Sequence, residues 1–82
     1  MNTTSGYGGH SARVKITLLL NGAEMTVVQL GPDFLFLDAP KSHPPANASL
    51  VLQVDESRRQ WEVHLPDGIS AESRRVAIAN PE

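Results

Sequence analysis

ARVKITLLLNGAEMTV, residues 12–27, decides the fold of this chain, because it contains two segments of alternating polarity joined by Asn21-Gly22. In the first segment large apolar side chains recur at every second position, the period of a half-buried β-strand. Asn-Gly is the dipeptide that best tolerates the positive φ angles of a two-residue hairpin turn. We therefore expect an antiparallel hairpin with a fixed register. The expected pairs are Ile16–Val27, Leu18–Met25 and Leu20–Ala23 on one face, and Thr17–Thr26 and Leu19–Glu24 on the other.

A short strand is expected after the turn at Gly31-Pro32, over residues 34–37. Its sequence, FLFL, is apolar on both faces, which is typical of a strand covered on both sides or lying in an interface. The turn before this strand could use an even or an odd number of loop residues. Each choice would point a different pair of side chains inward, and the sequence leaves the choice open. Three prolines then make residues 39–48 a surface connection.

Two further strands follow, with Leu50 and Leu52 in the first and Trp61 and Val63 in the second. A turn at Glu56-Ser57 would set Leu52 against Trp61 and Leu50 against Val63. We therefore expect Trp61 to be buried in the core against Leu52.

The end of the chain predicts a helix cap and a last strand. Ser70 is expected to cap one short helical turn near residues 70–73. Val76 and Ile78 mark a last short strand before Asn80-Pro81.

The predicted fold class is therefore all-β, with about six short strands in a small antiparallel barrel or curled sheet. A two-sheet sandwich is the alternative. The expected organisation is a flexible N-terminal tail over residues 1–11, a single β domain over residues 12–79, and a C-terminal end over residues 80–82.

Composition favours a soluble domain in a reducing cytoplasm. The 82 residues are 40% hydrophobic and 20% charged, with a formal net charge of −2 and no cysteine. No apolar stretch is long enough to span a bilayer, and the N-terminus lacks the regions of a signal peptide. The weak negative charge does not favour nucleic acid or acidic membranes, so neither is expected as a partner.

No set of residues indicates catalysis, a metal or a cofactor. The three histidines, His10, His43 and His64, are not at metal-ligand spacing from one another. Residues 68–72, GISAE, begin like a nucleophile elbow, but Glu72 replaces the second glycine. We therefore expect a chain that is not an enzyme and that holds no cofactor.

Two binding surfaces are possible. If the loop before residues 34–37 is even, Leu35 and Leu37 face outward and form an apolar patch with Val28 and Val51, suited to a protein partner or a homodimer. The competing interpretation is that the proline loop covers these leucines.

The second surface would bind an anion or a nucleotide. Four of the five arginines form two pairs, and Arg59 is expected opposite Val54, near a strand end. The plain alternative is that the arginine stems lie over apolar surface. The candidates are Arg58, Arg59, Arg74 and Arg75.

In its strand order and proline-rich connection, the segment from Arg13 to Leu65 resembles the small barrels of PilZ domains. That family is associated with cyclic di-GMP binding through an Arg-x-x-x-Arg arm and an Asp/Asn-x-Ser-x-x-Gly turn. The arm position here reads His10-Ser11-Ala12-Arg13 and the turn position reads Gln29-Leu30-Gly31-Pro32-Asp33, so both ligand motifs are missing. The resemblance therefore implies the architecture and not the ligand.

Residues 30–34, LGPDF, and 65–69, LPDGI, are similar to segments of short uncharacterised bacterial proteins. This second resemblance implies a bacterial all-β protein and brings no activity with it. The expected function is a non-catalytic protein-interaction or self-associating β module, and the alternative is a small anion- or nucleotide-binding barrel.

Overall fold

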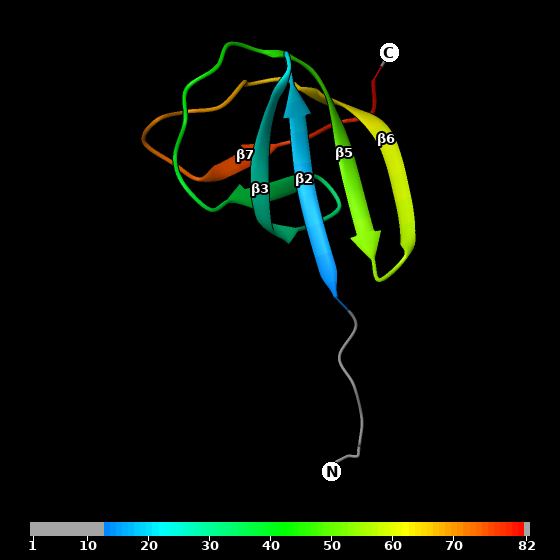
Figure 1. Ribbon diagram of the computed structural model, residues 1–82. Helices are drawn as coiled ribbons and strands as arrows, with labels where there is room; N and C mark the ends of the chain where they lie inside the picture. Colours follow the sequence, from blue (N-terminus) through cyan, green and yellow to red (C-terminus); the bar gives the residue numbers. More distant parts are fainter. Residues whose placement is uncertain (1–12, 82) are drawn as a thin grey trace.

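The computed structural model describes residues 13–81, which form one antiparallel sheet of six strands (Figure 1). The strands are β2 (Val14–Leu20), β3 (Ala23–Leu30), β4 (Phe34–Leu37), β5 (Ala46–Val54), β6 (Ser57–Leu65) and β7 (Arg75–Ala77). Their order in the sheet is β6-β5-β2-β3-β4-β7, and the sheet curls into a half-barrel. The all-β curled sheet expected from the sequence is confirmed, whereas the tail predicted over residues 1–11 lies outside the described residues.

The β2–β3 hairpin forms as its sequence predicts. Asn21 and Gly22 have φ angles of 51° and 82°, the left-handed conformation that a two-residue hairpin turn requires. All five cross-strand pairs expected between β2 and β3 are present, including Leu18 opposite Met25. The turn fixes the register, and the register places the apolar side chains of both strands on the concave face.

In β4, Leu35 and Leu37 face the core, whereas a loop with an even number of residues was expected to point them outward. The loop is indeed even, because the Gly31 N–H donates to the Phe34 carbonyl at 2.8 Å across Pro32-Asp33. However, β3 contains a bulge at Val28, so that Val27 and Leu30 both face the core. Leu30 pairs with Leu35, which therefore also points inward.

The β5–β6 hairpin turns at Asp55-Glu56, one residue before the predicted turn. Asp55 takes a φ of 54°, and its Oδ1 accepts a hydrogen bond from the Arg13 N–H at 3.0 Å. As a result Leu50 opposes Trp61 and Leu52 opposes Arg59, so the predicted pairing was wrong by two residues. A shift of two keeps each side chain on its face, and the apolar faces of the two strands still coincide.

The proline connection is shorter than expected, because residues 46–48 belong to β5 and pair with the end of β6. His43 pairs with Ile69 through two backbone hydrogen bonds of 2.8 and 2.9 Å, which holds the connection against the turn after β6. Gly68 makes this approach possible. Its φ is +64°, and a Cβ there would clash with the His43 carbonyl oxygen.

Residues 70–73 form a turn and not a helix. The Ser73 N–H donates to the Ser70 carbonyl at 3.3 Å, and the Ser70 hydroxyl accepts from the Glu72 N–H at 3.1 Å. Ser70 therefore satisfies a backbone donor, as predicted for a cap, but no helical residues follow it.

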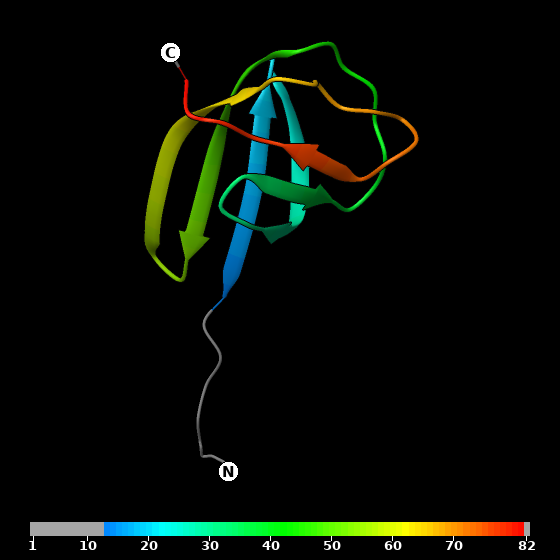
Figure 2. The ribbon, with the colours of Figure 1, turned by 180° about the vertical axis from the view of Figure 1, so that it is seen from behind.

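The concave face of the sheet carries the core, and one end of the half-barrel is closed. The fully buried side chains are Leu18, Leu20, Leu35, Leu37, Leu50, Leu65 and Val76. Backbone hydrogen bonds of 2.8 Å between His64 and Ala79 join β6 to the segment after β7. Figure 2 shows this segment crossing the half-barrel near the upper end of β6, which leaves the other end open.

Candidate interaction surface

The open end is the part of the concave face that no other segment of the described chain covers. β2, β5 and β6 extend past β3 and β4 there (Figure 1). Val14 is 59% exposed and Trp61 is 37% exposed, and both belong to rows that also contain core residues. We define the open end by its five apolar side chains: Val14, Ile16, Leu52, Val54 and Trp61.

Trp61 lies where two hollows of the open end meet. One hollow, of about 410 Å³, separates Trp61 and Val63 from the Gly31–Asp33 turn and from Ile78. The other, of about 590 Å³, lies between Trp61, Leu52 and Arg59. The expectation that Trp61 is a core residue was wrong. Its side chain points to the core face because it opposes the buried Leu50, but β6 is an edge strand, and no segment within residues 13–81 lies on its far side to cover the indole.

β6 also exposes a row of backbone groups along its outer edge. His64 directs its N–H and C=O outward, since both bond to Ala79. Alternation along a strand then directs the N–H and C=O of Arg58, Gln60 and Glu62 to the same edge. Within residues 13–81, no strand pairs with this part of β6. The edge is therefore a template for a further strand.

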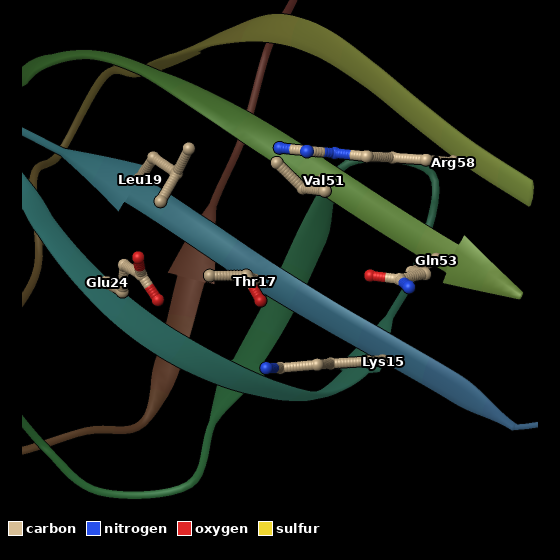
Figure 3. A pocket seen from close by; sticks show the side chains of 7 residues that line it. All are labelled: Lys15, Thr17, Leu19, Glu24, Val51, Gln53 and Arg58. Atoms are coloured by element: carbon tan, nitrogen blue, oxygen red, sulfur yellow. The ribbon is translucent and has the colours of Figure 1, made fainter. Parts of the chain in front are cut away.

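The convex face carries a separate hollow of about 180 Å³ with polar walls of mixed charge (Figure 3). Lys15 and Arg58 bring positive charge and Glu24 brings negative charge. Leu19 and Val51 lie between these polar side chains (Figure 3). The carboxylate of Glu24 opposes the binding of an anion in this hollow.

The predicted apolar patch does not form. Leu35 and Leu37 are completely buried and belong to the core, because the bulge at Val28 reverses the faces of β4. Val51 is also buried, although on the convex face. Only Val28 is exposed as predicted, by 58%. Both leucines lie within the hydrophobic core cluster, which also contains Ala48 and has Ala46 packed against it, two residues of the predicted proline connection.

The four candidate arginines lie at opposite edges of the sheet, two on β6 and two at the start of β7, where Arg74 directly precedes the strand. Arg58 and Arg59 are on β6, and Arg59 opposes Leu52 rather than Val54. Arg75 is on β7, where its guanidinium lies 5.0 Å from the centre of the Phe34 ring. Neighbouring residues on a strand point to opposite faces, so Arg58 and Arg59 diverge. The arginines are therefore not brought together as one anion site.

The two described histidines have local hydrogen-bond partners. His43 Nδ1 lies 2.7 Å from the Pro44 carbonyl oxygen, and its Nε2 lies 3.0 Å from the Asn21 side-chain nitrogen. His64 Nδ1 lies 2.8 Å from the Asn47 side-chain oxygen. Among residues 13–81, no three His, Asp or Glu side chains are placed to hold a metal ion. The same residues contain no helix long and apolar enough to cross a membrane.

Comparisons with protein families, with curated proteins and with solved structures find no match to this chain. The resemblance to PilZ domains is therefore not shown, and what the described residues do show is a small all-β antiparallel sheet that curls into a half-barrel. Trp61 and the edge of β6 are the features that sequence reasoning missed. The sequence carried no signal for either, since the predicted and the observed turn both put Trp61 on the core face, and the edge position of β6 follows from the pairing of β2 with β5.

Proposed function

We propose that this chain is a non-catalytic interaction module that binds another protein chain at the open end of its half-barrel. The observation that carries the proposal is Trp61, an indole exposed by 37% at the free edge of the sheet. Tryptophan is enriched among the residues that dominate binding energy at protein interfaces. A small domain gains nothing in stability from leaving such a side chain half in water, so a partner that covers it explains its position.

The surroundings of Trp61 support a protein partner more than a small ligand. The apolar side chains of the open end lie beside an arginine and an unpaired strand edge, which together offer packing, charge and backbone hydrogen bonds. The alternative of an anion- or nucleotide-binding barrel has less support, because two of its four arginines lie on β6 and the other two lie at the opposite edge of the sheet, at the start of β7.

Affinity capture tests the proposal, with the wild-type chain, Trp61→Ser and Val28→Ser as baits. We expect one protein, or an untagged copy of this chain, to bind the wild type and the Val28→Ser control in a stoichiometric amount. Trp61→Ser should lose at least about tenfold in binding, the effect of a hot-spot residue. A thermal melt of each bait shows that it is folded. Equal binding by all three baits, or binding by none, would contradict the proposal.

A further inference from the structure

We propose that the partner is a second copy of this chain, which adds its β6 to the free edge of β6 in antiparallel orientation. This inference rests on the proposed function, because it names the occupant of the same surface. The two-fold axis passes through Gln60 of both copies. The two half-barrels then share one continuous sheet, and the open ends of both copies meet along it.

The backbone of β6 permits this pairing at one register better than at its neighbours. The groups that point outward belong to Arg58, Gln60 and Glu62, and only these can form the closely spaced hydrogen-bonded pairs. With Gln60 on the axis, Arg58 faces Glu62 of the second copy, Gln60 faces Gln60, and Glu62 faces Arg58. All three outward residues are paired, which gives about six backbone hydrogen bonds.

The side chains at this register are self-complementary. On the convex face the guanidinium of Arg58 meets the carboxylate of Glu62 from the second copy, and the symmetry repeats the pair. Among the described residues of the same copy, Glu62 uses one carboxylate oxygen, as acceptor for the Ser49 hydroxyl. On the concave face Arg59 meets Trp61 of the second copy, which favours a cation–π contact. Opposite charges and cation–aromatic pairs directly across a ladder are stabilising.

The neighbouring registers are less favourable. Placing Arg59 on the axis sets two arginines directly opposite each other, and like charges in that position destabilise a ladder. Placing Trp61 on the axis would require Arg58 to pair with His64, whose backbone is already bonded to Ala79. The register through Gln60 is therefore the one that both charge and backbone favour.

Space along the edge is sufficient. The segment that ends at Pro81 crosses the half-barrel near the upper end of β6, and in both views no other described segment lies along the outer side of the lower half of the strand (Figures 1 and 2). A second copy approaching there would cover Trp61 without displacing the bridge between His64 and Ala79. It would also end the exposure of a nine-residue edge strand.

Charge reversal tests the proposal with a rescue that a merely structural role would not produce. Arg58→Glu places two like-charged pairs in the interface, and so does Glu62→Arg. Each variant alone should dimerise roughly tenfold or more weakly than wild type in analytical ultracentrifugation. An equimolar mixture of the two variants restores both opposite-charge pairs, so it should form a heterodimer as tightly as the wild type forms a homodimer. Lys41→Glu, which makes the same charge change in the proline connection, is the matched control and should leave dimerisation unchanged.

A second variant tests the backbone contacts. Gln60→Pro removes an outward N–H that pairs with no described residue of its own copy, and proline is tolerated on edge strands. We expect a folded monomer, with folding checked by circular dichroism. A wild-type monomer up to about 1 mM, the weak limit of specific binding, would overturn the second-copy proposal. If a different protein then binds the wild type but not Trp61→Ser, the proposed function as an interaction module is still supported. Two weakened variants that fail to associate when mixed would also overturn the register.

Discussion

Replacing Leu35 and Phe36 in turn by glutamine tests which side of β4 faces the core. Leu35 is completely buried, so Leu35→Gln loses about 2–3 kcal/mol of apolar burial. The buried amide costs about 1–3 kcal/mol more if it finds no hydrogen-bond partner. The sum, about 3–6 kcal/mol, is close to the whole stability of a domain this small, about 3–10 kcal/mol. We therefore expect Leu35→Gln to be unfolded or barely folded at 25 °C.

Phe36→Gln is the matched control on the neighbouring residue. Phe36 is half-buried on the convex face, where its ring meets the Phe34 ring edge-on with centroids 5.7 Å apart. The new amide reaches water there, so the cost is about 1–2 kcal/mol, from the aromatic contact and part of the burial. Urea unfolding followed by circular dichroism measures both. If Phe36→Gln proves the more damaging change, β4 faces the other way and the bulge at Val28 is misplaced.

Two turn residues give further predictions. Gly68→Ala should destabilise by more than about 1 kcal/mol, because it combines an unfavourable φ with a clash against the His43 carbonyl. Gly22→Ala meets no atom, so thermal melts should show the smaller loss there. Asp55→Ala should cost about 1–2 kcal/mol, because it loses both the tolerated positive φ and the acceptor for the Arg13 N–H. Asp55→Asn keeps both properties and should melt within a few degrees of the wild type, and an equal loss in both variants would contradict this account.

The sequence predicted the parts of the fold where a turn and a pattern agree. Asn21-Gly22 and the alternation on either side of it determined the first hairpin completely. In the second hairpin the pattern was equally clear, but Asp55-Glu56-Ser57 offers two turn positions. The prediction of which side chains of β5 and β6 face the core was still correct, because a register shift of two residues leaves each side chain on the same face.

The bulge in β3 had no signal in the sequence. Val27 and Val28 are the same residue type, so nothing distinguishes the one that points inward from the one that is exposed. Yet this bulge determines that Leu35 and Leu37 are core residues. A local irregularity of this kind depends on the packing of the whole sheet, and a period-two pattern does not reveal it.

The candidate surface depends on position in the sheet rather than on residue type. Arg58, Trp61 and Glu62 were visible in the sequence, and Trp61 was assigned to the core because it alternates with polar residues and was expected to oppose Leu52. That β6 is an edge strand follows from the pairing of β2 with β5, a contact between segments far apart in the chain. Local sequence reasoning had no means of predicting that contact.

The placement of β2 between β3 and β5 has a consequence for the folding rate. Each hairpin can form early, since a two-residue turn brings its strands together at little entropic cost. Pairing the two hairpins is slower, because Val14 of β2 pairs with Val54 of β5, and the proline connection lies between these strands in the sequence. The pairing of β4 with β7 is also long-range, because β7 lies near the end of the chain. A sheet with so many non-local pairs belongs to the class that folds in milliseconds to seconds. Until β5 reaches β2, both hairpins present bare ladder edges, and the nascent chain is then most exposed to mispairing with its neighbours.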